Sequence, residues 1–280
     1  MSGEITRFAP SPTGLLHLGH VLAAEVAWRE ARRSGGTFLL RLEDIDTGRC
    51  RETFATALEE DLKWMGYAWP VPVWRQSGRM PVYAAALGRL RGMDLLYPCF
   101  CTRQEIAAAV SAPQGPEGPV YPGTCRHLTT VERRERLASG AGCAWRLDAE
   151  RALARTGTLT WHDRLQGGFR VSMEALGDVV LARRDIPVSY HLAVTVDDAA
   201  QGVTLVTRGR DLLAATHAHR LLQALLDLPV PQWLHHELVC DEAGRRLAKR
   251  DGARSLRHLR DDTGWSPAYI RRAIGAQLPS

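Results

Sequence analysis

The first 42 residues alternate between apolar and polar positions in a way that predicts a strand, a helix and a second strand. Residues 4–9 have the pattern of a short strand, and residues 20–33 have the apolar spacing of a helix. Two glycines end that helix before a strand over residues 37–42. This order implies a parallel pair joined by a right-handed crossover, so ligands are expected at the carboxyl ends of the strands.

The remaining pattern predicts a second half of the same sheet, separated from the first by an insertion. Helices are expected over residues 49–65, 81–93, 190–200 and 212–226, and strands over residues 95–97 and 203–207. A Pro- and Gly-rich stretch precedes four short strands that we place in the insertion, at residues 144–147, 159–162, 168–171 and 178–182. We expect an α/β fold in which a Rossmann-like parallel sheet is split by an inserted α+β subdomain. The expected divisions are 1–95 (first half of the nucleotide-binding domain), 96–185 (insertion), 186–238 (second half) and 239–280 (C-terminal segment).

Composition changes this picture little. The chain has 280 residues, 45% hydrophobic and 24% charged, which is ordinary for a globular protein. Its net charge of +5 is a mild bias toward a polyanionic partner. No apolar run approaches the roughly 20 residues that a membrane helix needs, and the N-terminus lacks a signal-peptide pattern. We therefore expect a cytoplasmic monomer that contacts no membrane.

The most informative motif is His17-Leu18-Gly19-His20, placed where the first strand gives way to the helix. A helix start offers unpaired N–H groups and the positive end of the helix dipole, which suit a phosphate chain. His17 and His20 add hydrogen-bond donors where negative charge builds on the α-phosphate, and Gly19 leaves room for a flat base against the backbone. The pattern favours ATP binding; the alternative is a loop whose histidines only cap the helix.

A second phosphate-binding candidate comes late in the chain. Residues 241–244 are expected to form a turn, and the basic run 245–250 follows them. Arg246 and Lys249 on such a loop suit the triphosphate of Mg²⁺–ATP and the leaving pyrophosphate. Taken alone, the run equally describes a solvated basic hairpin.

Three cysteines indicate a metal site rather than a disulfide framework. Cys99 and Cys101 are separated by one residue, and Cys125 follows within a loop-rich span. Zn²⁺ prefers four tetrahedral ligands, and a closed set holds together a loop with little core of its own. We predict one structural zinc ion in the insertion, with Tyr121 or His127 as the fourth ligand.

Five segments in order resemble the class I aminoacyl-tRNA synthetases, in the glutamyl and glutaminyl branch. They are residues 7–14 (Arg-Phe-Ala-Pro-Ser-Pro-Thr-Gly), 17–20 (His-Leu-Gly-His), 41–46 (Arg-Leu-Glu-Asp-Ile-Asp), 190–193 (Tyr-His-Leu-Ala) and 207–212 (Thr-Arg-Gly-Arg-Asp-Leu). The residues after Lys249 are too few for an anticodon-binding domain of about 100 residues, so we expect none.

The short tail and the cysteine pattern together resemble the glutamyl-queuosine tRNA(Asp) synthetase family. That resemblance implies activation of L-glutamate with ATP, without tRNA, followed by transfer of glutamate to the queuosine base at the wobble position of tRNA(Asp). It also implies that Tyr121 completes the zinc site with Cys99, Cys101 and Cys125.

The resemblance and the chemistry of an amino acid with two carboxylates and one ammonium assign six residues to a glutamate pocket: Arg7, Ala9, Ser11, Glu43, Tyr190 and Arg208. Arg7 and Arg208 are expected to read the carboxylates by bidentate geometry, which rejects glutamine. Glu43 is expected to pair with the ammonium and Tyr190 to donate a hydrogen bond. Ala9 and Ser11 line the pocket.

The catalytic group is expected to be His17, His20 and Lys249, acting on ATP with Gly19 and Arg246. The family's late loop usually begins with lysine and carries serine before its second lysine, whereas Arg246 and Ala248 occupy those places here. We expect weaker loop closure rather than loss of activity.

Other functions stay open at this point: a small enzyme that charges the ordinary 3′ end of glutamate tRNA, a non-catalytic tRNA-binding relative, and a nucleotidyltransferase that adenylates a small metabolite. Four further histidines show no carboxylate partner in the sequence and are assigned to helix surface and strand packing: His217, His219, His235 and His236.

Overall fold

The computed structural model describes residues 3–102, 104–106, 120–239 and 254–279. Most expected elements are confirmed, with small shifts at their ends. The helices are α1 (Leu18–Arg33), α2 (Glu52–Trp64), α3 (Met80–Gly92), α5 (Thr130–Ala138), α6 (Ala149–Thr156), α7 (Tyr190–Ala200), α8 (Ala215–Leu225), α9 (Leu256–Asp261) and α10 (Pro267–Ala273). The strands are β1 (Ile5–Phe8), β2 (Thr37–Leu42), β3 (Trp74–Arg75), β4 (Leu96–Cys99), β5 (Ala144–Leu147), β6 (Thr160–Asp163), β7 (Gly167–Arg170), β8 (Val180–Arg183), β9 (Leu205–Gly209) and β10 (Gln232–His236).

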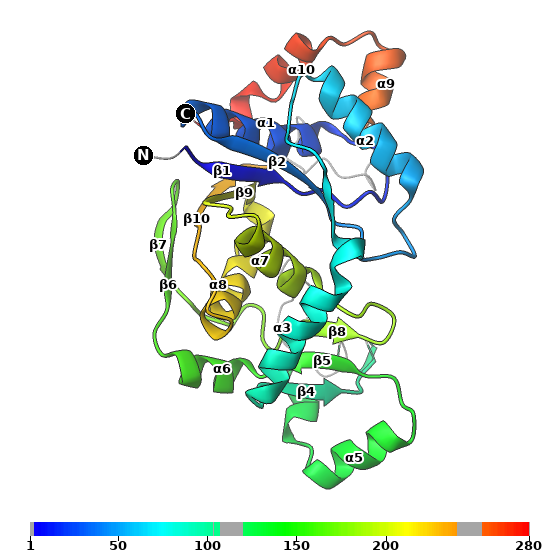
Figure 1. Cartoon of the computed structure of the whole chain (residues 1–280), viewed down its shortest axis with the longest axis vertical. Coiled ribbons are helices and arrows are strands. Elements are labelled where there is room, and N and C mark those ends of the chain that lie inside the picture. Colours follow the sequence, from blue (N-terminus) through cyan, green and yellow to red (C-terminus); the bar gives the residue numbers. More distant parts are fainter. Residues whose placement is uncertain (1–2, 103, 107–119, 240–253, 280) are drawn as a thin grey trace.

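The central layer consists of parallel strands from both halves of the chain. β1, β2 and β3 pair in parallel, and so do β9, β10 and β6. The two sheets meet where the Thr204 N–H donates to the Ile5 carbonyl at 2.9 Å, just before β9. This confirms the parallel sheet. β1, β2, β9 and β10 lie together in the upper half of the molecule (Figure 1), and residues at or just after their carboxyl ends line one pocket at the rim of the sheet.

The arrangement of the short strands differs from expectation. β4, β5 and β8 form a small antiparallel sheet, as expected for an insertion, and it lies with α5 at the opposite end of the molecule from α9 and α10 (Figure 1). The hairpin β6–β7, which we expected in the same small sheet, instead adds to β10 through Asp163 and Trp233. A four-residue strand carries too little pattern to specify its neighbour. In the observed pairing, Trp161 of β6 packs against Trp233 of β10.

The last helices pack back onto the first layer. Leu256 and Leu259 of α9 and Ile270 of α10 are buried in the same core as α1, β1, β2 and α2. Burial of each such side chain contributes about 1.5–3 kcal/mol, so this segment is part of the domain rather than an appendage. No described helix is both long and apolar enough to cross a membrane.

Candidate functional site

A pocket of about 460 Å³ opens at the rim where the parallel strands end. It is bounded by the ends of β1, β9 and β10 and by the start of α1. It brings together nine residues that the sequence assigned to the site: Arg7, Ala9, Ser11, His17, Gly19, His20, Glu43, Tyr190 and Arg208.

His17 and His20 form a reciprocal cap at the start of α1. The Nδ1 atom of His17 accepts the Gly19 N–H at 3.1 Å, and Nδ1 of His20 accepts the His17 N–H at 3.2 Å. Because each Nδ1 is an acceptor, each neutral ring carries its proton on Nε2. A Cβ on Gly19 would lie 3.0 Å from the His17 ring, so glycine preserves this arrangement. Capping and phosphate binding are therefore compatible, because the backbone N–H groups donate to Nδ1 of each ring while Nε2 carries an N–H that can donate to a phosphate oxygen.

Arg208, on β9, is a buried cation held by neutral partners. Its Nε donates to His235 at 3.0 Å, Nη1 lies 3.3 Å from the Tyr190 hydroxyl and 3.2 Å from His219, and Nη2 donates to Thr216 at 2.5 Å. Within the described part of the chain, none of its polar contacts is a carboxylate. Burial lowers the pKa of Arg208. An anionic ligand in the pocket would compensate this charge.

Arg7, on β1, has a different environment. Its Nε and Nη2 donate to the two oxygens of Asp198 at 3.0 and 3.2 Å, and its Nη1 donates to the Thr207 carbonyl at 3.1 Å. The charge of Arg7 is thus already paired, although it lines the same pocket.

Glu43 lies just beyond β2 and is held by Arg41, which is fully buried. Arg41 donates to Glu43 at 3.1 Å and lies 2.8 Å from Asp198. Burial raises the pKa of Glu43, and the cations Arg41 and Arg7 oppose that rise. Three cations and three carboxylates thus form one balanced network, which consists of Arg7, Arg41, Arg79, Glu43, Asp197 and Asp198. Arg208 lies outside this network.

Arg246 and Lys249 lie outside the described residues, and so does Ala248. The chain on either side of them lies at the site. Leu238 and Val239 line the pocket, and Ser255 forms an antiparallel bridge with His17.

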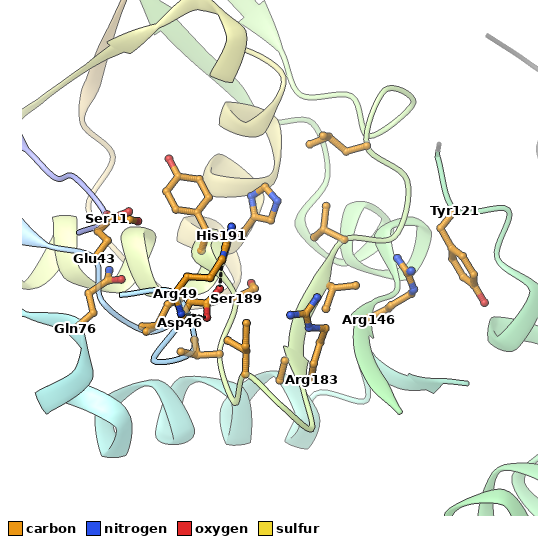
Figure 2. Close-up of a pocket in the computed structure, with 18 of the residues that line it drawn as sticks. Ser11, Glu43, Asp46, Arg49, Gln76, Tyr121, Arg146, Arg183, Ser189 and His191 are labelled. Atoms are coloured by element: carbon orange, nitrogen blue, oxygen red, sulfur yellow. Dashed lines mark hydrogen bonds and ion pairs between the residues drawn. The ribbon is translucent and has the colours of Figure 1, made fainter. Parts of the chain in front are cut away.

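A second pocket, of about 530 Å³, adjoins the first and shares Ser11, Thr13, Glu43 and Tyr190 with it. Figure 2 shows Ser11 and Glu43 at one end of this pocket and Arg146 and Tyr121 at the other. The second pocket therefore runs from the rim of the parallel sheet to the insertion.

The three expected cysteines converge in that insertion. The Sγ atoms of Cys99, Cys101 and Cys125 lie within 4.8 Å of one another. The Tyr121 hydroxyl is 3.7 Å from Cys101 Sγ, whereas His127 is exposed and lies outside the cluster. Three thiols and a phenol around one point are a donor set that fits a zinc ion. The Arg146 guanidinium lies 3.8 Å from the Tyr121 ring centre, and both side chains line the second pocket.

Sequence reasoning missed the residues that orient the arginines. His219 and His235 do not serve packing alone, since both contact Arg208, and His235 has the carboxylate partner that we did not expect, Asp163 at 2.7 Å. His217 does pack as expected, accepting from the Ser172 N–H. A signal existed for one missed pair: two adjacent acids, 197 and 198, interrupt an otherwise apolar helix.

Comparison with known proteins identifies similar chains. Residues 5–276 match the family model described as tRNA synthetases class I (E and Q), catalytic domain. The chain is 51% identical to a glutamyl-Q tRNA(Asp) synthetase of Rhodobacter capsulatus, over 97% of this chain and 99% of that protein. It is 39% identical to glutamate–tRNA ligase 2 of Nitrosococcus oceani, covering 57% of that enzyme.

Among solved structures, a glutamate tRNA ligase from Elizabethkingia meningosepticum in complex with its amino acid superposes with a TM-score of 0.72 at 28% identity. The alignment covers 94% of this chain and 54% of that one, so the chain spans about half the length of that ligase.

Proposed function

The chain belongs to the catalytic-domain family of class I tRNA synthetases for glutamate and glutamine, which makes it a ligase, and we propose that it transfers glutamate to queuosine in tRNA(Asp). In this proposal ATP activates L-glutamate without tRNA, and the glutamyl-adenylate then esterifies the queuosine base at the wobble position. The Rhodobacter capsulatus relative of nearly equal length supports this acceptor.

The observation that carries the proposal is the buried charge of Arg208, whose hydrogen-bond partners among the described residues are all neutral. No carboxylate bonds directly to it in the described part of the chain, whereas the charges of Arg7, Arg41 and Glu43 already belong to a balanced network. We assign Arg208 and Tyr190 to the side-chain carboxylate of glutamate. A carboxamide in the same position would leave the cation buried without a counter-charge, which disfavours glutamine.

Arg7 and Glu43 would complete the amino-acid site. Arg7 keeps donors beyond its bonds to Asp198 and would orient the α-carboxylate, while Glu43 would pair with the ammonium. Ala9 and Ser11 line the same wall. Burial raises the pKa of Tyr190, which keeps its hydroxyl protonated and able to donate.

ATP would lie along the start of α1, where helix N–H groups and the Nε2 atoms of His17 and His20 favour phosphate oxygens. An oxygen of the glutamate α-carboxylate attacks the α-phosphorus, and the bond to the β-phosphate breaks, releasing pyrophosphate with Mg²⁺. His17 and His20 would stabilise the charge of that transition state, together with Lys249 and Arg246. The Ser255–His17 bridge supports this, because it keeps the chain near the site six residues after Lys249.

The second pocket would receive the acceptor nucleoside. It opens onto the first beside Glu43, and Arg49, Arg146 and Arg183 line it, which suits an RNA ligand. A ring hydroxyl of queuosine would attack the carbonyl carbon of the adenylate, losing its proton as the ester forms and AMP leaves.

Zinc would be held by Cys99, Cys101, Tyr121 and Cys125. When bound, it would supply a structural cross-link that fixes the loop bearing Tyr121 against the second pocket.

The acceptor is tested by measuring transfer of labelled glutamate to tRNA(Asp) with and without queuosine. We expect labelling only of the modified tRNA, and equal labelling after the 3′-terminal adenosine has been removed. Loss of labelling on the trimmed tRNA would instead favour ordinary 3′-end charging, the activity named for the Nitrosococcus oceani relative. Binding without transfer would favour a non-catalytic relative.

A further inference from the structure

Three buried side chains link the β6–β7 hairpin to the first pocket. Asp163 ends β6, His235 lies on β10, and Arg208 lies on β9 opposite His235 in the parallel pair. We infer that Asp163 is a positioning residue: it fixes the proton of His235 on Nδ1, so that Nε2 accepts from Arg208 and orients its guanidinium. The inference rests on the proposed role of Arg208 as the reader of the acidic side chain.

The carboxylate of Asp163 faces donors on both oxygens. Oδ1 accepts the N–H groups of Leu165 at 2.9 Å and Gln166 at 3.0 Å, and Oδ2 accepts the His235 N–H at 3.0 Å. Oδ2 also lies 2.7 Å from His235 Nδ1. These bonds hold the pKa of Asp163 below its usual value although its burial opposes this. An ionised carboxylate only accepts, so Nδ1 must carry the proton.

The other nitrogen of His235 is therefore an acceptor. Burial lowers the pKa of His235 to about 4, although its bond to Asp163 opposes this, and the ring is neutral near pH 7. In a neutral ring protonated at Nδ1, Nε2 has a lone pair, and it lies 3.0 Å from the Arg208 Nε donor. The opposite tautomer would set two N–H groups against each other.

The position of the His235 proton matters because, among the residues that the structure describes, Arg208 is held by neutral hydrogen-bond partners. Its other bonds go to Thr216, Tyr190 and His219, and none of them supplies a counter-charge. Of these partners, Tyr190 also lines the pocket and is expected to contact the ligand. The bond from Nε to His235 therefore anchors the guanidinium on the side away from the ligand.

The tautomer is tested directly by imidazole ¹⁵N NMR of the intact protein, with the His235 signals identified by their loss in His235→Gln. We expect the Nδ1-protonated neutral form at pH 7.5. An Nε2-protonated or cationic ring would overturn the inference. This readout does not depend on catalysis.

The kinetic test is Asp163→Asn, assayed by glutamate-dependent ATP–pyrophosphate exchange. The two N–H groups at Oδ1 favour the amide oxygen there, which turns the amide NH₂ toward His235. This removes the acceptor of the His235 backbone N–H and forces the ring proton from Nδ1 to Nε2. We expect the KM for glutamate to rise roughly 10- to 100-fold, as for a lost hydrogen bond to a charged group, with a smaller change in kcat and in the KM for ATP. Asp227→Asn makes the same chemical change at an exposed position and is the control, which should leave these kinetic constants unchanged.

Asp163 could instead act only on the structure of the β6–β7 turn, and repeating Asp163→Asn in the His235→Gln variant distinguishes the two roles. In His235→Gln, the side-chain oxygen can accept from Arg208 without any tautomer to fix. Adding Asp163→Asn there should leave the KM for glutamate within about two-fold, even if the melting temperature falls. An equal rise of KM in both backgrounds would overturn the inference. Absence of glutamate-dependent exchange in the unaltered protein would instead reject the proposed function, and the NMR result would stand separately.

Discussion

The carboxylate of Asp198 accepts hydrogen bonds from the guanidinium of Arg7 at both oxygens, with Nε 3.0 Å from Oδ1 and Nη2 3.2 Å from Oδ2. Two arginines that look equivalent in the sequence, Arg7 and Arg208, are therefore electrostatically different. Arg7 forms an ion pair with Asp198 at the wall of the pocket, whereas the described hydrogen-bond partners of Arg208 are neutral. This difference decides which of them is assigned to the side-chain carboxylate of the substrate.

Asp198→Asn should be strongly destabilising. The change leaves Arg7 and Arg41 buried with one fewer counter-charge, so the free energy of unfolding should fall by about 3–5 kcal/mol. Urea titration followed by circular dichroism measures this. Glu52→Gln, which breaks the exposed pair with Arg75, is the matched control and should cost less than about 1 kcal/mol. Equal costs for the two variants would contradict the buried network.

Arg208→Gln should strongly weaken recognition of the acidic side chain. Loss of a buried charged contact corresponds to about 2–5 kcal/mol, so kcat/KM for glutamate should fall by about 30-fold to several thousand-fold. Arg210→Gln is the control, because Arg210 is exposed and pairs with Glu237 outside the site. Similar kinetics for the two variants would remove Arg208 from the glutamate site.

The free energy of unfolding should fall as the pH is lowered through the range in which the buried histidines titrate. Burial lowers the pKa values of His191 and His235 to about 4 in the folded protein, against about 6.5 when unfolded. The unfolded chain therefore takes up these protons first, and each histidine costs up to about 1.4 kcal/mol per pH unit as the pH falls from 6.5 toward 4. Unfolding measured across this range should show a shallower slope in His235→Gln. An unchanged slope would mean that His235 does not titrate as described.

Zinc binding should depend on Tyr121 and not on His127. Tyr121→Phe removes the hydroxyl beside the thiols, so we expect the metal to be lost to a chelator at least several-fold faster than from the unaltered protein. His127→Ala and Cys143→Ser, both outside the cluster, should retain it. Metal content by mass spectrometry during chelator challenge provides the readout. Loss in His127→Ala with retention in Tyr121→Phe would reverse the ligand assignment.

Local pattern predicted the five helices that we expected and most of the expected strands, because each depends on its own periodicity and end signals. It did not predict the short helices α5, α6, α9 and α10 or the strands β3 and β10. α1 begins at Leu18, two residues earlier than expected, since the His17 side chain caps it. The pocket-lining residues between positions 7 and 43 were also predictable, because a strand–helix–strand unit brings the carboxyl ends of its strands together.

Pairing between distant strands was not predictable from the same pattern. The contact of Arg208 with His235 exists because β9 and β10 pair in parallel with those residues opposite each other. Asp163 reaches His235 only because the β6–β7 hairpin joins that sheet. No periodicity in a four- or five-residue strand encodes its neighbour, so the groups that position Arg208 emerged only from the fold.

The central claim is that the paired imidazoles at the start of α1 and the uncompensated Arg208 hold ATP and glutamate side by side. The most direct test is ATP–pyrophosphate exchange with the purified protein in the absence of any tRNA. We expect exchange that depends on glutamate and is not supported by glutamine. No exchange with glutamate, or exchange supported by glutamine or by a different acid instead, would contradict it.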